Sequence, residues 1–245
     1  MKTLILIPSR LSATRLPGKP LLKINGLSII SHVVRKAQQA NIGEVIVAAE
    51  DQEIIDDVEN NGGKAILTSN EHKTGTDRIY EAFSKLKLND IDLVMNLQGD
   101  EPLMNIEDII NLNFQMIKNK SEFGTLASII LDKKFCDNIN IVKVKTEQKL
   151  ADNSFPEALD FMRKSSEKAS NIYHHLGIYC YKTDTLKKFI SFKQSYNEKE
   201  RSPEQLRALD NGIKIRVALA KSSPIGVDTK EDFVAIKKIM EYKSK

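Results

Sequence analysis

The first half of the chain alternates short, continuous apolar runs with segments whose apolar residues recur at helical spacing. Continuous apolar runs predict strands that are buried on both faces, as in a parallel sheet. These runs lie at Thr3–Ile7 and Glu44–Ala49, and further strands are expected at Lys64–Leu67 and Leu93–Leu97. The helical spacing predicts helices over Ser28–Ala40, Asp51–Asn61, Asp77–Leu86 and Glu107–Ile117. We therefore predict an α/β fold with a mostly parallel, Rossmann-like sheet flanked by helices.

The pattern changes after about residue 120, where strands follow one another with little helix between them. The expected strands are Gly124–Leu131, Ile141–Lys145, Leu159–Arg163 and Leu176–Tyr181, separated by the polar stretches Asp132–Asn140 and Lys164–Ser170. A helix near Ser202, a strand at Ile213–Leu219 and a helix at Thr229–Tyr242 complete the chain. We expect a single domain over residues 1–245, with an inserted, mainly antiparallel lobe over approximately 123–182.

Composition narrows the class of protein. The 245 residues are 41% hydrophobic and 29% charged, which excludes a disordered chain. The net charge is only +4, aromatic residues make up 6% and tryptophan is absent, so nucleic-acid binding is not expected. Cys136 and Cys180 are the only cysteines, too few for a disulfide framework. Apolar runs are too short for a membrane span, and we expect a cytoplasmic protein with no membrane partner.

The loop after the first predicted strand carries three cations, Arg10, Arg15 and Lys19. Loops at the carboxyl ends of parallel strands form the ligand crevice, and arginine forks with a lysine charge suit a polyphosphate. Gly18 would let the backbone approach a ligand closely. The loop matches neither the P-loop nor the dinucleotide fingerprint. From charge alone, a solvated basic surface loop is an equally good interpretation.

Two aspartates are candidate magnesium ligands. Asp100 follows the predicted strand Leu93–Leu97 and would face the same crevice as the basic loop, although a turn is the alternative. Asp228 precedes the last helix, and Glu231 three residues later makes a helix cap the favoured interpretation on sequence alone. At the predicted helix 77–86, Thr76 reads as the N-cap.

Three separated motifs carry a family resemblance. They are the S-x-T-R-L-P-G-K-P-L pattern that begins at Ser12, the run Asn96–Pro102, and the run His175–Tyr179. Together they resemble the 3-deoxy-manno-octulosonate (Kdo) cytidylyltransferases, also called CMP-Kdo synthetases, from Leu4 to about Phe233. Sialic acid activators carry an R-x-G-S-K loop instead, and sugar-1-phosphate enzymes carry a glycine-richer G-x-G-T-R-L loop.

The resemblance implies a set of site residues. Those that would bind the nucleotide are Pro8, Arg10, Arg15, Lys19, Thr74, Gly75, Thr76 and Arg78. Those that would hold the sugar acid are Gln98, Arg163, His175, Tyr179, Glu204 and Gln205. Asp100 and Asp228 would hold Mg²⁺, and with Arg10, Arg15 and Lys19 they would form the catalytic group. Glu101 has no assigned role.

The implied reaction converts CTP and Kdo to CMP-Kdo and diphosphate, for lipopolysaccharide biosynthesis. The resemblance also implies a homodimer that pairs through the antiparallel lobe, with Gly124–Leu131 and Ile141–Lys145 as the pairing strands. The chain departs from the family pattern at 164–170, and His174 stands where the family often has arginine. An enzyme for the 8-amino relative of Kdo or for another sugar acid, and a silent nucleotide-binding protein, remain the alternatives.

Overall fold

A computed structural model describes residues 1–12, 15–130, 138–164, 171–224 and 226–242. The chain divides into two compact units. The first unit holds Lys2–Ile109 and Pro224–Lys245, and the second holds Met1 and Ile110–Ser223. The expectation of one domain with a lobe over 123–182 stays a prediction.

The first unit is built on parallel strands in the order β6-β1-β4-β5. Their bounds are β1 (Thr3–Ser9), β4 (Gly43–Ala49), β5 (Ala65–Leu67) and β6 (Leu93–Asn96). The central strand β1 pairs with β4 along its whole length and with β6 over its first half. The apolar run of β1 is completely buried, as the sequence predicted, because helices such as α1 and α3 pack on the sheet and cover its side chains.

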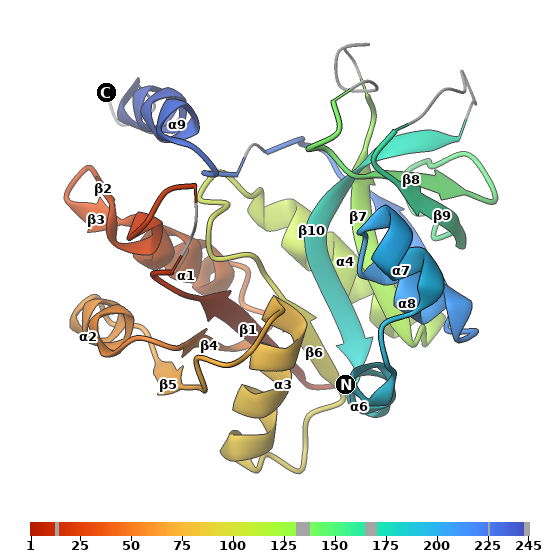
Figure 1. Cartoon of the computed structure of the whole chain (residues 1–245), viewed down its shortest axis with the longest axis horizontal. Helices are drawn as coiled ribbons and strands as arrows, with labels where there is room; N and C mark the ends of the chain where they lie inside the picture. The colour runs from red at the N-terminus through yellow and green to blue at the C-terminus, as the bar shows by residue number, and fades with distance from the viewer. Residues whose placement is uncertain (13–14, 131–137, 165–170, 225, 243–245) are drawn as a thin grey trace. The chain divides into compact units, whose positions relative to one another are not determined.

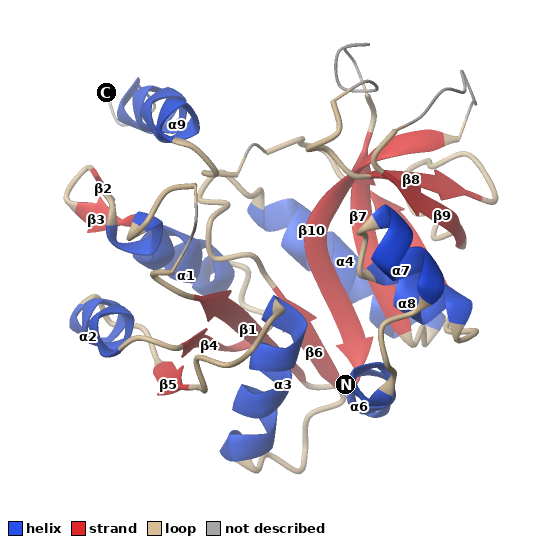
Figure 2. Ribbon diagram, in the orientation of Figure 1, coloured by secondary structure: helices blue, strands red, loops and turns tan. Residues whose placement is uncertain are grey.

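Helices flank these strands, as Figure 2 shows. They are α1 (Ile29–Gln39), α2 (Gln52–Asn60), α3 (Gly75–Leu86) and α9 (Lys230–Tyr242), and α4 (Ile106–Asn119) begins here and continues into the second unit. A 3-10 turn, η1 (Lys19–Leu21), and a hairpin of β2 (Lys23–Ile24) and β3 (Leu27–Ser28) lie between β1 and α1.

The C-terminal helix α9 packs against this hairpin region. Ile24, Ile29, Val227 and Ile236 form a buried apolar cluster, each at most 1% exposed. The cluster joins the end of the chain to the segment that follows β1. It therefore fixes Asp228, the residue after Val227, beside the basic loop.

The second unit holds a mixed sheet in the order β11-β7-β10, with β8 paired to β10 and β9 paired to β8 (Figure 1). The strands are β7 (Phe123–Ser128), β8 (Lys143–Thr146), β9 (Ala158–Met162), β10 (Ile172–Lys182) and β11 (Ile215–Leu219). Among the described strands of this unit, β7 and β11 run parallel to each other and the other pairs are antiparallel.

Three short helices, α6 (Thr183–Ser191), α7 (Tyr196–Arg201) and α8 (Gln205–Asp210), follow β10. The sequence analysis missed α6 and α7, and it began the next helix near Ser202, whereas α8 starts at Gln205. The α/β class, the parallel strands and the antiparallel segment are confirmed. The polar stretches at 132–140 and 164–170 lie mostly outside the described residues. Within the described ranges, none of the helices has the length and apolar character needed to cross a bilayer.

Candidate active site

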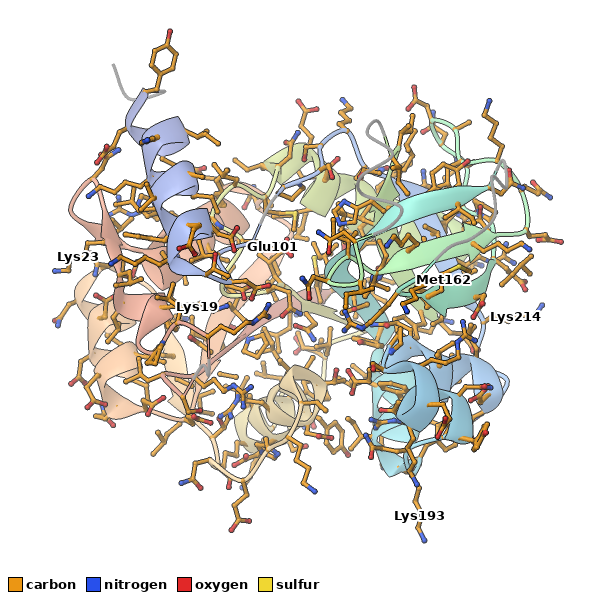
Figure 3. The ribbon with its side chains drawn as sticks, turned by 45° about the horizontal axis from the view of Figure 1, so that its top comes forward. Lys19, Lys23, Glu101, Met162, Lys193 and Lys214 are labelled. Atoms are coloured by element: carbon orange, nitrogen blue, oxygen red, sulfur yellow. The ribbon has the colours of Figure 1, made fainter. Side chains whose placement is uncertain are left out.

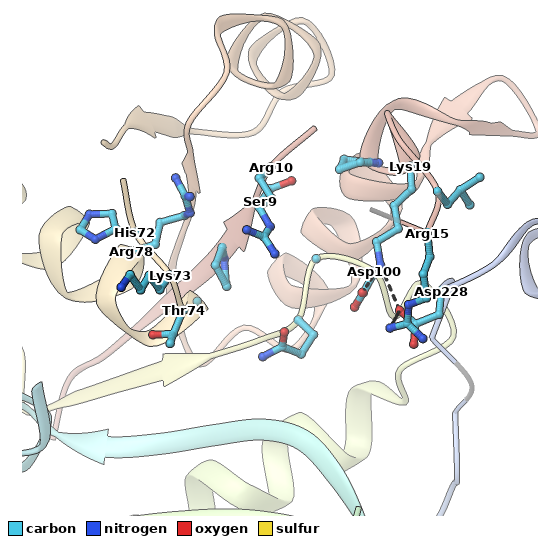
Figure 4. A pocket seen from close by; sticks show the side chains of 16 residues that line it. Ser9, Arg10, Arg15, Lys19, His72, Lys73, Thr74, Arg78, Asp100 and Asp228 are labelled. Carbon is cyan, nitrogen blue, oxygen red and sulfur yellow. Dashed lines mark hydrogen bonds and ion pairs between the residues drawn. The ribbon is translucent and has the colours of Figure 1, made fainter. Parts of the chain in front are cut away.

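A cavity of about 340 Å³, a size typical of small-ligand sites, lies at the carboxyl ends of β1 and β6 in the first unit. Segments far apart in the sequence form its walls (Figure 4). The lining residues are Pro8, Ser9, Arg10, Arg15, Leu16, Lys19, Pro20, His72, Lys73, Thr74, Gly75, Arg78, Gln98, Gly99, Asp100 and Asp228. Most of the residues that the resemblance implied for the nucleotide and the metal therefore lie around one cavity.

The floor of the cavity depends on close backbone packing. A Cβ atom at Gly99 would lie 2.9 Å from the Pro8 carbonyl oxygen and 3.0 Å from Ile30 Cδ1. A Cβ atom at Gly75 would lie 3.2 Å from Pro8 Cγ. Glycine at 99 thus lets the segment after β6 lie directly against the end of β1, because any larger residue would collide with backbone.

The basic loop is held at both of its ends. The Gly18 N–H donates to the Leu11 carbonyl at 3.0 Å, and Gly18 has a φ of 70°, which glycine adopts without strain. The Leu11 N–H donates to Asp51 at 2.8 Å, and the Ser12 hydroxyl donates to Glu50 at 2.7 Å. These bonds fix the start of the loop to the end of β4. Residues 13 and 14 lie outside the described part.

Lys19 lies between the two candidate metal ligands. Its Nζ is 2.5 Å from Asp100 Oδ2, 3.4 Å from Asp228 Oδ1 and 2.7 Å from the Val227 carbonyl oxygen. Arg15 adds a second contact to Asp228 at 3.1 Å. The Lys19 side chain is 13% exposed and points into the unit, whereas Lys23 projects outward (Figure 3). Two carboxylates and two cations thus meet at one end of the cavity.

The helix-cap interpretation of Asp228 is wrong. The Thr229 hydroxyl accepts the Asp232 N–H at 3.2 Å, and Asp232 accepts the N–H groups of Thr229 and Asp228 at 2.9 and 3.2 Å. Thr229 and Asp232 therefore form the reciprocal cap, one residue later than expected. Because the cap is provided elsewhere, the Asp228 carboxylate is available to face Lys19 and Arg15.

The paired carboxylates fit a magnesium ion. Both reach the same nitrogen of Lys19, so this ammonium group marks a point that is favourable for a cation. No group of three or more histidine, cysteine, aspartate or glutamate side chains suited to a metal occurs within the described residues. A site with two carboxylates is suited to Mg²⁺ that shares its coordination with substrate phosphates.

The carboxyl group of Glu101, a half-buried residue, neighbours this cluster. Its Oε2 has no hydrogen-bond partner within the described part of the chain. Burial raises the pKa of the Glu101 carboxyl to about 8, and the negative charges of Asp100 and Asp228 act in the same direction. Lys19 opposes the shift. The family resemblance assigns no role to Glu101, and the structure places its carboxyl group close enough to Asp100 and Asp228 for their charges to act on it.

The N-terminus of α3 forms the opposite wall. Thr74, not Thr76, is the N-cap, because its hydroxyl accepts the Asp77 N–H at 3.1 Å. The Thr76 side chain is 2% exposed and is not among the described residues that line the cavity. The expectation that Thr76 caps the helix is therefore wrong, since the helix begins two residues earlier than the hydrophobic pattern indicates.

Arg78 lines the cavity but is committed to internal contacts. Its guanidinium forms a buried ion pair with Glu50 and donates to Thr68 Oγ1 at 2.8 Å and to the Ser69 carbonyl at 3.1 Å. Glu50 also accepts from Ser12 at 2.7 Å. Glu50 therefore links the basic loop to the wall at α3, and it is a positioning residue that the sequence analysis did not identify.

In the second unit, the structure joins three of the residues assigned to the sugar acid. The Gln205 amide donates to the Tyr179 hydroxyl, and the rings of Tyr179 and His175 are 5.5 Å apart. Arg163 instead donates to the Ile139 carbonyl at 3.1 Å, and Glu204 lies 3.4 Å from Arg207. Gln98, the remaining member, lines the cavity of the first unit.

The two adjacent histidines of β10 make stability depend on pH. Burial lowers the pKa of His175 to about 3, with a smaller effect of His174, and burial and then Lys143 lower that of His174 to about 4. In the unfolded chain both rings bind a proton below about pH 6.5. The contribution of the two neutral rings to folding stability is therefore fully present above pH 6.5. This contribution is lost as the pH falls toward 4.

We expect the free energy of unfolding in urea to decrease by up to about 1.4 kcal/mol per pH unit for each of the two rings below pH 6. His175→Gln, which keeps a hydrogen-bonding group for Thr125 Oγ1 at 3.0 Å, should reduce this slope. An identical slope in the wild type and the variant between pH 6.5 and 4.5 would contradict this.

Ser9 and Lys73 also line the cavity, and neither was expected from the sequence to be a site residue. Lys73 lies in the segment before α3, and its charge alone does not show whether the side chain faces a ligand or solvent. Ser9 directly follows Pro8 at the end of β1 and reads as the end of a buried strand. Parallel sheet topology is the signal that could have found Ser9, because the last residue of a central strand faces the crevice.

Comparisons with known proteins agree with this arrangement. The chain matches the family model described as cytidylyltransferase over residues 4–215. It is 40% identical to a 3-deoxy-manno-octulosonate cytidylyltransferase of Rhodopseudomonas palustris (strain BisB18), with 98% of each chain covered. It is 41% identical to the protein of the same name from Thermodesulfovibrio yellowstonii, again with 98% of each chain covered.

A solved structure shows the same fold. The structure of CMP:2-keto-3-deoxy-manno-octonic acid synthetase complexed with CTP superposes with a TM-score of 0.89 at 35% identity, covering 99% of this chain and 100% of that one. The identity and coverage of these relatives far exceed what a shared fold alone would give. The chain therefore belongs to the cytidylyltransferase family and, within it, to the 3-deoxy-manno-octulosonate cytidylyltransferases.

Proposed function

We propose that the cavity of the first unit binds CTP and that the protein transfers CMP from CTP to the anomeric hydroxyl of Kdo, releasing diphosphate. The observation that carries the proposal is the position of Lys19 between Asp100 and Asp228 at one end of a cavity lined by further cations. The names of the relatives supply the two substrates. The proposal also places the reaction in the cytoplasm and in lipopolysaccharide biosynthesis.

The cations of the cavity divide into two groups. Lys19, Arg15 and Arg78 are already paired with carboxylates. Arg10 and Lys73 line the cavity without an ion pair to any residue within the described ranges. Arg10 is therefore available for the phosphate oxygens of CTP, and it can bind two oxygens at once. Lys73 lies at the α3 wall, beside Thr74 and Arg78 (Figure 4).

Asp100 and Asp228 would hold Mg²⁺, which when bound polarises the α-phosphate and neutralises charge on the leaving diphosphate. Lys19 would turn from the carboxylates toward the phosphates and stabilise charge there. The hydroxyl oxygen of Kdo attacks the α-phosphorus in line and loses its proton to solvent. A new P–O bond forms, and the bond from the α-phosphorus to the oxygen that bridges to the β-phosphate breaks, which releases diphosphate. Positioning and charge neutralisation carry such a transfer, so no nucleophilic side chain is required.

Diphosphate release tests this function directly. Purified protein is incubated with Mg²⁺, each of CTP, UTP, ATP and GTP, and a panel of sugar acids that includes Kdo and its 8-amino relative. We expect release only with CTP and Kdo together. Release with CTP and a different acid would retain the chemistry and change the substrate, whereas CTP binding without release from any pair would support a silent binding protein.

We infer that the protein is a homodimer and that helix α4 provides the contact. The strands that the sequence suggested are not free to pair, since β7 lies between β11 and β10, and β8 lies between β10 and β9. Helix α4 instead exposes Ile110, Phe114 and Ile117, which are 41%, 51% and 36% accessible. On its other side α4 buries Asp108 and Gln115.

The exposed face of α4 is complementary to itself. Ile110 and Ile117 lie on either side of Phe114, and Glu107 and Lys118 lie near opposite ends of the same face. If two copies of α4 cross antiparallel about a two-fold axis near Phe114, Ile110 meets Ile117 of the other copy and the acidic end meets the basic end. This pattern favours a second copy of the chain over an unrelated partner.

Light scattering at micromolar concentration should therefore give the mass of a dimer, and Phe114→Glu should give a monomer with an unchanged circular dichroism spectrum. Ile239→Glu on α9 is the matched control, because Ile239 has a similar exposure of 42%. A monomeric wild type, or a Phe114→Glu variant that stays dimeric, would refute the α4 interface.

A further inference from the structure

The hydroxyl group of Ser9 is buried and has no hydrogen-bond partner within the described part of the chain. The residue is only 6% exposed. A buried polar atom without a partner is unfavourable, and native proteins retain few of them. The other side chains in this condition are Asn96, Glu101, Gln115 and Ser128. Of these five described residues, only Ser9 lines the cavity.

The position of Ser9 is fixed by the packing around it. Ser9 is the last residue of β1 and pairs in register with Ala49 of β4. Its neighbour Pro8 is held between Gly75 and Gly99, which approach it closely. The backbone of Ser9 therefore cannot shift easily to bring its hydroxyl to a protein acceptor, and the unpartnered state is built into the fold.

Ser9 lies between the two ends of the cavity. Figure 4 shows Lys19 and Asp100 on one side of it and Thr74 and Arg78 on the other. With the triphosphate at the cationic end and the nucleoside toward α3, the group that passes over Ser9 is the ribose or the α-phosphate. Both present oxygen atoms, and a serine hydroxyl can donate to or accept from them.

We propose that Ser9 is a nucleotide-binding residue, whose hydroxyl remains without a partner until CTP enters the cavity and then forms a hydrogen bond with an oxygen atom of its ribose or α-phosphate. This inference rests on the proposed function, because it takes CTP as the occupant of the cavity. It adds a contact that the resemblance did not assign, since the assigned residues of this segment are Pro8 and Arg10.

Ser9→Ala should change CTP affinity and protein stability in opposite directions. Loss of one neutral hydrogen bond should weaken CTP binding about three- to tenfold. The ligand-free protein should keep its melting temperature or gain stability, because replacing an unpartnered buried hydroxyl by a methyl group removes an unfavourable burial. A residue with a merely structural role would give the reverse, with lower stability and unchanged affinity.

The experiment is calorimetric titration of CTP into the wild type, Ser9→Ala and Ser128→Ala, with melting temperatures of the ligand-free proteins. Ser128 is the matched control, since its hydroxyl is also buried and unpartnered but the residue lies in the second unit and not at the cavity. We expect weaker binding only for Ser9→Ala, and in turnover a higher KM for CTP with kcat within about twofold.

Titration with 2′-deoxy-CTP distinguishes the two oxygens. If the effect of Ser9→Ala disappears with this nucleotide, the bond is to the ribose 2′-hydroxyl, and if it persists, the bond is to another oxygen of the nucleotide. Equal CTP affinity of Ser9→Ala and the wild type would overturn the inference while leaving the CTP site intact. A wild type that does not bind CTP would instead refute the proposed function.

Discussion

Asp100→Asn should lower kcat with CTP and Kdo by about a thousandfold while leaving the fold intact. The amide has the size of the carboxylate but lacks its charge, so it is a poor ligand for Mg²⁺ and no longer attracts Lys19, whose Nζ lies 2.5 Å from Asp100. Steady-state diphosphate release at several Mg²⁺ concentrations measures the effect, which should be only partly relieved at high Mg²⁺.

Asp90→Asn is the control for this substitution. Asp90 is 61% exposed and contacts only the exposed Lys2 among the ion pairs of the described chain, so its loss should leave kcat unchanged. Near-normal turnover of Asp100→Asn at ordinary Mg²⁺ would mean that the two aspartates do not form the metal site.

Lys19→Met should separate metal binding from turnover. In the ligand-free structure the ammonium group of Lys19 lies where a cation is favoured, between Asp100 and Asp228. Its removal leaves two carboxylates without this counterion, and we expect Mn²⁺, used as a probe, to bind more tightly in the absence of nucleotide. Turnover should fall by about a hundredfold, because the charge that stabilises the phosphates is lost.

Mn²⁺ binding by electron paramagnetic resonance and diphosphate release give the two readouts. Lys23→Met is the control, since Lys23 is exposed at the β2–β3 hairpin of the same unit and should change neither measurement. A Lys19→Met protein with weaker Mn²⁺ binding, or with full activity, would show that Lys19 does not alternate between the carboxylates and the substrate.

The parallel part of the fold could be predicted because each of its strands has a distinct pattern. The apolar runs of β1, β4 and β6 are continuous, which occurs when both faces of a strand are covered. Topology then predicted that the loops after β1 and β6 share a cavity. Helices α6 and α7 were missed because they are short and contain several charged residues. They also depend on tertiary contacts, such as the buried ion pair between Glu198 of α7 and Arg207 of α8.

The details of the site depended on contacts that no local pattern reveals. Asp228 and Glu231 match a capping pattern, but Thr229 and Asp232 form the cap, so the sequence favoured the wrong role for Asp228. Arg78 lines the cavity, but only the structure shows that its guanidinium group is paired with Glu50. The hydrogen-bond partners of a hydroxyl group such as that of Ser9 come from segments that are distant in the sequence. Only the folded structure therefore shows whether such a partner exists.

The central claim is that CTP and a metal ion bind at the end of β1, beside Asp100 and Asp228. A crystal structure of the protein with CTP and Mn²⁺, with the metal located by its anomalous scattering, tests this most directly. We expect one anomalous peak within coordination distance of both aspartates, with the triphosphate against Arg10 and Lys19. A metal that contacts neither aspartate, or a nucleotide bound outside this cavity, would contradict it.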